Sequence, residues 1–96
     1  MNTATKLTFN DSTLAITGDI TFLTVADLYN QLQVILKNNT INAVDCGGVN
    51  HADSTAVSFL LAIEKGCKGR PLEFLNVDHS IRALAKLYSV DEILFR

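Results

Sequence analysis

Proline is almost missing from this sequence, which has a single proline among its 96 residues. Apolar residues make up 48% of the chain. A chain this rich in apolar residues and this poor in proline does not have the composition of a disordered segment. Its length is enough to build one hydrophobic core, so we expect residues 1–96 to form a single domain.

Basic clusters are missing as well. Eight Lys and Arg residues are outnumbered by ten Asp and Glu residues, which gives a net charge of −2, and no run of basic residues occurs. A surface that binds nucleic acid needs a basic stripe to offset the phosphate charge. The charge pattern therefore argues against nucleic acid as a partner.

Long apolar runs are also lacking. None approaches the roughly 20 residues that cross a bilayer, and the longest near the middle of the chain spans residues 59–63. Residues 1–6 do not show the basic and then apolar pattern of a signal peptide. We expect a cytoplasmic protein that does not insert into a membrane but can reach one by docking on a membrane protein.

Metal and nucleotide patterns do not occur either. Cys46 and Cys67 form no C-x-x-C pair and are expected to be reduced, buried side chains. His51 and His79 lie far apart in sequence, whereas zinc needs three or four converging ligands. The glycine pair at residues 47–48 fits neither the P-loop nor the dinucleotide-binding pattern. We therefore expect a turn at residues 47–48, and we expect the protein to bind no metal and no cofactor.

What the sequence does contain is a regular alternation of strand and helix patterns. Two alternating runs across a short polar turn predict a β-hairpin, and apolar residues at spacings of three and four predict helices. The expected order is β-β-α-β-α-β-α, an α/β fold in which the hairpin and further parallel strands form a four-stranded mixed sheet with helices packed against it. The predicted strands are residues 6–10, 13–18, 41–46 and 72–77, and the predicted helices begin at Thr24, Asp53 and Asp78.

The start of the second predicted helix carries the most informative triplet, Asp53, Ser54 and Thr55. An aspartate there accepts backbone N–H groups and suits the helix dipole. Two adjacent hydroxyls in the first turn suit a phosphate or hydrogen bonds to a protein partner, although from spacing alone simple capping explains the triplet equally well. Phe59 falls off the apolar stripe of this helix, so we expect it on the flank, facing a partner. The other aromatic residues named here are expected in the core: Phe22, Tyr29, Tyr88 and Phe95.

A catalytic use of the same hydroxyls is a further alternative. His51 stands three residues before Ser54 and could act as the base of a small hydrolase. The G-x-S-x-G elbow that exposes a nucleophilic serine is absent from the sequence, however. We therefore expect a binding protein rather than an enzyme.

Three stretches resemble the STAS domain family, which includes bacterial anti-sigma factor antagonists and the cytoplasmic tails of sulfate transporters. Residues 18–21 (GDIT) resemble its G-(D/E)-(L/I)-(D/T) stretch before the first helix, and residues 43–49 (AVDCGGV) its V-D-(L/C)-x-x-V strand and loop. Residues 52–56 (ADSTA) resemble its D-S-S/T-G signature. The resemblance covers nearly the whole chain and implies the STAS fold with Asp53, Ser54 and Thr55 at the partner contact.

Residues 84–88 (LAKLY) and the short length resemble one branch of this family. Its members are accessory subunits of Mla-type ABC transporters, which move phospholipids between the membranes of Gram-negative bacteria and so maintain outer-membrane lipid asymmetry. This implies binding to the ATPase subunit, peripheral to the inner membrane, through Ser54. The alternative is an anti-sigma factor antagonist, in which phosphate on Thr55 breaks the partner contact. Both hydroxyls are candidate phosphorylation sites, but the signature glycine is Ala56 here, which weakens the phospho-switch.

Overall fold

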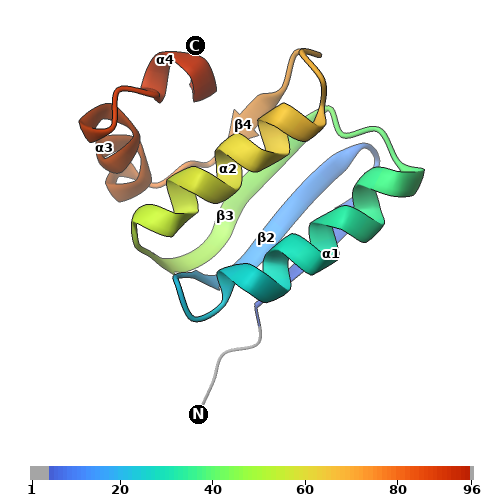
Figure 1. Ribbon diagram of the computed structural model, residues 1–96, viewed down its shortest axis with the longest axis horizontal. Coiled ribbons are helices and arrows are strands. Elements are labelled where there is room, and N and C mark those ends of the chain that lie inside the picture. Colours follow the sequence, from blue (N-terminus) through green and yellow to red (C-terminus); the bar gives the residue numbers. More distant parts are fainter. Residues whose placement is uncertain (1–4, 96) are drawn as a thin grey trace.

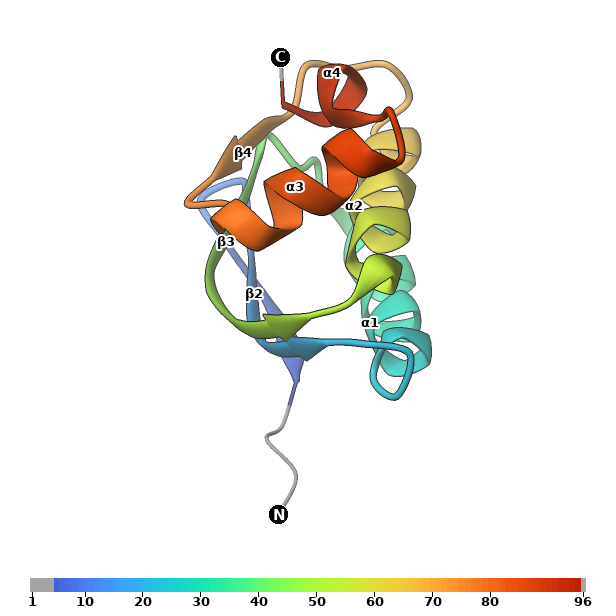
Figure 2. The same cartoon turned by 90° about the vertical axis from the view of Figure 1, so that its left-hand side faces the viewer.

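A four-stranded sheet with helices against one of its faces makes up the part of the chain that the computed structural model describes, residues 5–95 (Figures 1 and 2). Helices α1 and α2 lie side by side across the sheet, and α3 and α4 stand beside α2 at the side of β4. The elements are β1 (Lys6–Asn10), β2 (Thr13–Ile20), α1 (Val25–Asn38), β3 (Ala43–Ala52), α2 (Ser54–Gly66), β4 (Glu73–Leu75), α3 (His79–Leu87) and α4 (Asp91–Leu94).

The strands follow one another across the sheet in the order β1-β2-β3-β4. The hairpin pairs β1 with β2 in antiparallel orientation. Parallel pairing then places Leu14 of β2 opposite Val44 of β3, and Asp45 of β3 opposite Leu75 of β4. Both parallel connections run through a helix, as crossovers between parallel strands require. The predicted α/β fold with a mixed four-stranded sheet is confirmed.

Side chains alternate between the two faces of the central strands. In β2, Leu14, Ile16 and Ile20 are fully buried beneath the helices, whereas Thr13 and Thr17 point to the opposite face. An antiparallel or mixed sheet covered on one side has this inside-outside alternation. The helices contribute the buried side chains that pack on this face of the sheet: Leu28, Leu32, Ala56, Val57, Leu60, Ile63, Ile81 and Ala85.

Strand β3 is longer than the sequence pattern indicated. The expectation of a turn at residues 47–48 is wrong, because β3 continues through both glycines to Ala52. The register shifts there, so that Ala15 pairs with Asp45 but Thr17 pairs with Gly48, which is a β-bulge. A Cβ on Gly48 would lie 2.7 Å from Cγ2 of Thr17 and 2.9 Å from the carbonyl oxygen of Ile16. Glycine is needed here for close approach of two strands, not for a turn.

The expectation that Phe59 faces a partner is wrong. Its side chain is fully buried, and its ring meets that of Tyr29 edge to face, with 5.3 Å between centroids. Helix α2 lies between α1 on one side and α3 on the other (Figure 1). Its buried surface is therefore wider than a single apolar stripe, and a residue off that stripe is still covered.

The two cysteines are free and buried, as predicted. Burial, reinforced by the nearby carboxylate of Asp45, raises the pKa of the Cys46 thiol to about 12. That thiol therefore stays protonated at neutral pH and behaves as a small apolar side chain. Across residues 5–95, every helix is too short or too polar to cross a membrane.

Candidate functional site

Asp53 caps the N-terminus of α2, as the sequence predicted. Its carboxylate oxygen Oδ1 accepts the backbone N–H of Thr55 at 2.8 Å and also accepts the hydroxyl of Thr55. The cap satisfies one of the backbone donors that every helix start leaves free. Within this arrangement the Thr55 hydroxyl is already used by its own helix start.

The same aspartate also holds a second segment of the chain. Its other oxygen, Oδ2, accepts the backbone N–H of Phe22 at 3.1 Å, and its own N–H donates to the carbonyl of Ile20 at 3.1 Å. The hydrogen bond from the Thr55 hydroxyl, with those from the backbone of Thr55 and Phe22, lowers the pKa of Asp53, while burial opposes this. Asp53 is thus a junction between two loops as well as a cap.

The loop between β2 and α1 is braced by its threonines. The hydroxyl of Thr24 accepts the N–H of Thr21 at 3.0 Å and donates to the carbonyl of Asp19 at 2.8 Å. The hydroxyl of Thr21 accepts the N–H of Leu23 at 3.2 Å. The predicted helix start at Thr24 is confirmed, since Thr24 is the N-cap residue of α1, but its side chain turns back into the loop and makes no cap bond to α1.

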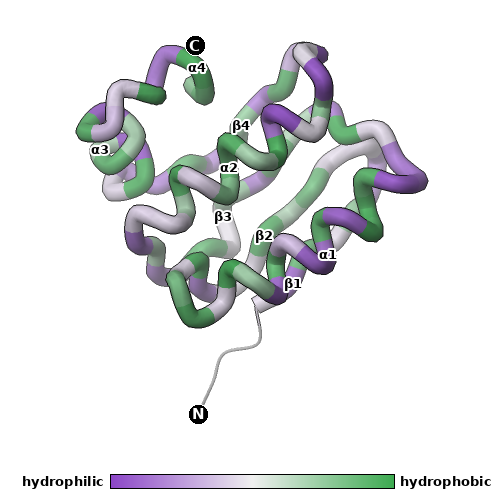
Figure 3. The backbone as a smooth tube through the Cα atoms, viewed as in Figure 1, coloured by the Kyte–Doolittle hydropathy of each residue, from purple (hydrophilic) through white to green (hydrophobic). Residues whose placement is uncertain are grey.

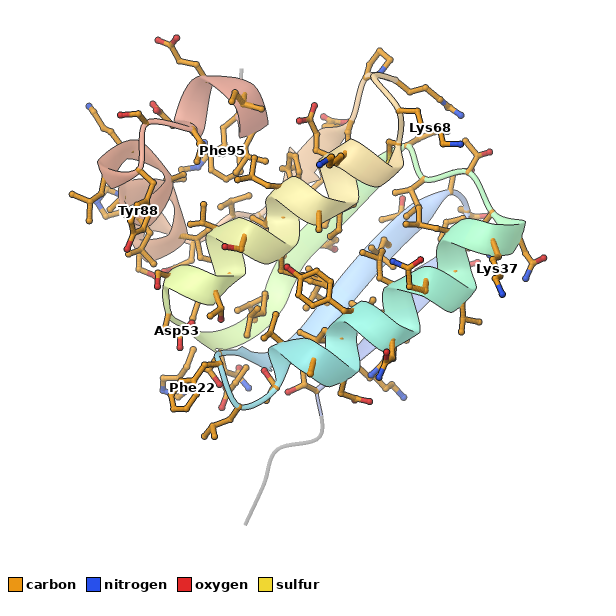
Figure 4. All side chains as sticks on the ribbon, in the orientation of Figure 1. Phe22, Lys37, Asp53, Lys68, Tyr88 and Phe95 are labelled. Carbon is orange, nitrogen blue, oxygen red and sulfur yellow. The ribbon has the colours of Figure 1, made fainter. Side chains whose placement is uncertain are left out.

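This braced loop presents two large apolar side chains to solvent. Phe22 is 71% exposed and Leu23 is 80% exposed, and the hydropathy colouring marks the loop tip as hydrophobic (Figure 3). Phe22 and Asp53 lie close together at the same end of the molecule (Figure 4). The expectation of Phe22 in the core is wrong, because a tight turn has no inner face. An apolar pair inside a turn was the signal that sequence reasoning missed.

The two hydroxyls of the triplet differ in availability. Ser54 is exposed, and its hydroxyl has no hydrogen-bond partner among residues 5–95. Thr55 is half-buried, and its hydroxyl is bonded to Asp53. At a helix N-terminus a free hydroxyl can donate to a partner, or accept from it, without first breaking an internal bond. Of the two hydroxyls, that of Ser54 is the more accessible.

A groove of about 350 Å³ begins at Ser54 and runs between α2 and the turn after α3. On α2 its lining follows positions i, i+4 and i+7, which share one helix face. Tyr88 forms the opposite wall and is 52% exposed, so its expected place in the core is wrong. The lining consists of Ser54, Val57, Ser58, Leu61, Tyr88 and Val90.

The hydrolase arrangement is not assembled. Nδ1 of His51 lies 3.2 Å from Oδ1 of Asp19, and the imidazole is largely exposed. Within residues 5–95 it makes no hydrogen bond to Ser54 or Thr55. Those residues also contain no group of three or more His, Cys, Asp or Glu side chains placed to hold a metal ion. Ser54 is thus an exposed polar residue with exposed apolar side chains on one side and an apolar-lined groove on the other.

Comparisons with known proteins agree with this architecture. A family model described as "Mlab, STAS domain" matches residues 3–95. The fold is similar to the solved structure of the anti-sigma factor antagonist SpoIIAA in its unphosphorylated form, with a TM-score of 0.70. That match has 14% sequence identity and covers 93% of this chain and 84% of the other, so it supports the fold alone. No curated protein sequence matches the chain.

Proposed function

The chain belongs to the MlaB-type STAS domain family, and from that premise we propose that it is a non-catalytic accessory subunit of an ABC transporter. The subunit binds and stabilises the ATPase subunit of a Mla-type phospholipid transporter, which maintains the lipid asymmetry of the outer membrane. STAS domains are binding and regulatory modules. The domain works in the cytoplasm and lies at the inner membrane only as part of the complex.

The observation that carries this proposal is the exposed Ser54 between two apolar flanks. On one side stand Phe22 and Leu23 on their braced loop, and on the other the groove that ends at Tyr88. Protein interfaces gain most of their binding energy from such apolar and aromatic groups around a few well-placed polar ones. A loop that is already held in place also loses little conformational entropy on binding.

Stabilisation of the ATPase follows from mass action. A subunit that binds only the folded, assembled form of its partner shifts the partner toward that form by an amount set by its concentration relative to the dissociation constant. The STAS domain therefore needs no chemistry of its own, and it contacts neither the lipid nor ATP. Its contribution is contact area at the start of α2.

The state of Thr55 favours this role over that of an anti-sigma factor antagonist. The antagonist hypothesis places the phosphate on Thr55, a half-buried residue whose hydroxyl donates a hydrogen bond to Asp53. A kinase would first have to break that bond and open a turn that is followed by the buried Ala56. The transporter hypothesis places the partner contact at Ser54, which is exposed.

Affinity purification tests the proposal. The chain is given an affinity tag and purified from membranes of its native cells in mild detergent, and the proteins that accompany it are identified by mass spectrometry. We expect the ATPase and membrane subunits of one ABC transporter at stoichiometric levels, with Ser54 and Thr55 unmodified. Recovery of a protein kinase instead, together with phosphate on Thr55, would overturn the proposal in favour of the antagonist role.

A further inference from the structure

A second groove lies at the opposite end of the two central helices. Its volume is about 440 Å³, and it opens between the C-terminal halves of α1 and α2. Leu32, Leu36 and Ala62 contribute apolar side chains to it, and Lys37, Lys65 and Lys68 contribute ammonium groups. Figure 4 shows Lys37 and Lys68 at one end of the helix pair and Asp53 and Phe22 at the other.

The charge of this groove is of one sign. It holds three of the eight basic residues of a chain whose net charge is −2, and none of the described residues that line it is acidic. The ion pair within 4 Å that joins His51 to Asp19 lies outside this groove. The groove is therefore a basic patch on an acidic protein.

The helix dipole explains the positions of only some of these three lysines. Lys37 and Lys65 stand in the last turns of α1 and α2, where a cation suits the helix dipole. Lys68 lies beyond the helix in the following turn, and the dipole does not explain the apolar groups between the lysines. Gly66 brings the two helices close, since a Cβ on it would lie 2.7 Å from Cδ1 of Leu36.

We propose that this groove is a second docking surface, which takes an acidic amphipathic helix of a protein partner. The apolar side of such a helix enters the space above Leu36 and Ala62, and its carboxylates meet the three ammonium groups, the helix-in-groove mode of recognition. The groove lies about 16 Å from Ser54 along the axis of α2, so it does not depend on the role of Ser54.

An anionic membrane fits the same groove less well. The apolar groups are more buried than the lysines, with Leu32 only 1% exposed, whereas a surface that enters a bilayer needs apolar groups that protrude. Three lysines attract an anionic membrane only weakly. A protein helix satisfies both the charge and the shape.

Two synthetic peptides of equal length serve as probes. One is an amphipathic helix of Glu and Leu, and the other has Lys in place of every Glu. Each is titrated into the ¹⁵N-labelled full chain while backbone amide shifts are recorded. We expect the Glu/Leu peptide to shift the amides of Gln33, Lys37 and Lys68, with an affinity that falls as salt is added, and the Lys/Leu peptide to leave them unchanged.

A matched pair of double variants locates the site. Lys65→Glu with Lys68→Glu reverses two charges in the groove, and Lys6→Glu with Lys86→Glu makes the same change in net charge outside it. Lys65 and Lys86 both occupy the last turn of a helix, so both pairs perturb a helix end equally. The first pair should weaken the Glu/Leu peptide about tenfold and the second by less than about twofold, with melting temperatures confirming that both fold.

Three results would overturn the proposal. The Glu/Leu peptide could fail to bind or could shift amides at the Ser54 end instead. The control pair could weaken it as much as the groove pair, which would show attraction by net charge alone. Vesicles of phosphatidylglycerol could bind the parent chain but not the variant with Lys65→Glu and Lys68→Glu, while neither peptide displaces them. That result would make the groove a membrane contact.

Discussion

Helices α2 and α3 begin with the same local structure, yet only the start of α2 lies beside both an exposed apolar loop and the groove that begins at Ser54. Asp53 accepts the backbone N–H of Thr55 at 2.8 Å together with its hydroxyl. Asp78 does the same for Ser80, with the N–H at 3.0 Å. In each helix the aspartate is followed by one residue and then by a hydroxyl residue, so the local cap cannot be what distinguishes them.

The difference lies in what each aspartate reaches beyond its own helix. The second oxygen of Asp53 binds the backbone of Phe22, which is 31 residues away in sequence. Within residues 5–95, the side-chain hydrogen bonds of Asp78 reach no farther than Ser80, two residues away. What distinguishes the start of α2 is the exposed apolar loop and the groove that tertiary structure places beside it.

The largest expected effect is on partner binding at the first residue after each aspartate. Ser54→Glu should lower the affinity for the co-purified ATPase subunit by about a hundredfold or more, because it buries an unpaired charge in the contact. His79→Glu makes the equivalent change at α3 and should leave affinity unchanged. Both should fold, since an acidic residue suits the first turn. The measurement is a titration by surface plasmon resonance.

Equal affinity of the two variants for the ATPase subunit would remove the start of α2 from the interface. Melting temperatures distinguish a lost contact from a lost fold. We expect both variants to melt within a few degrees of the parent, because the altered side chains are exposed and make no internal hydrogen bond among residues 5–95.

The two aspartates should differ in how much each contributes to the free energy of unfolding. Asp53→Ala removes the cap and also leaves the N–H of Phe22 without its acceptor, so the free energy of unfolding should fall by about 2 kcal/mol. Asp78→Ala removes a cap on an exposed helix start and should cost clearly less. Urea unfolding followed by circular dichroism gives both values. Equal losses would mean that the bond to Phe22 contributes nothing to folding.

The braced loop should matter for binding and hardly at all for folding. Leu23→Ser removes an 80% exposed apolar side chain and should weaken the ATPase complex about tenfold, the size expected of a moderate hot spot. Val34→Ser is the control, since Val34 is 65% exposed on α1 and outside the Ser54 surface. Isothermal titration calorimetry of both variants decides the point. A loss that is the same for Val34→Ser would show a general effect of surface polarity.

Periodicity and capping residues were enough to predict the order of elements and the mixed sheet. The helix starts at Asp53 and Asp78 were also found, because an N-cap is a local chemical signal that a short stretch of sequence contains in full. The same local signal at both positions could not tell which start binds a partner. The prediction for α2 came from the family resemblance rather than from the spacing.

The errors concern where individual residues lie in the folded structure. Phe59 was predicted to be exposed because its helix was considered alone, without the neighbouring α1 and α3 that cover it. Phe22 was predicted to be buried because aromatic residues usually are, although its place in a four-residue turn leaves it outside. The bulge at Gly48 depends on the approach of Thr17, which no local pattern records.

The smallest expected effect is on how the free energy of unfolding depends on pH. Hydrogen bonds from hydroxyl and backbone donors lower the pKa of Asp53 and of Asp78 from the ordinary value of 3.8. A carboxyl whose pKa is lower in the folded state stabilises the fold above its unfolded pKa, and this stabilisation is lost as the pH falls through the folded pKa. The free energy of unfolding should therefore decline with acidification below about pH 4.

Asn at either position keeps an acceptor for the helix N–H but does not titrate, so each substitution should flatten that decline. Asp53→Asn should flatten it more than Asp78→Asn, because protonation of Asp53 disturbs donors from both Thr55 and Phe22, whereas Asp78 serves its own helix start. The measurement is a series of urea midpoints from neutral pH down to about pH 3 for the parent and both variants. A steeper decline for Asp53→Asn than for the parent would mean that the carboxylate at the α2 start is not stabilised by these bonds, and the contrast between the two helix starts would have to rest on exposed side chains alone.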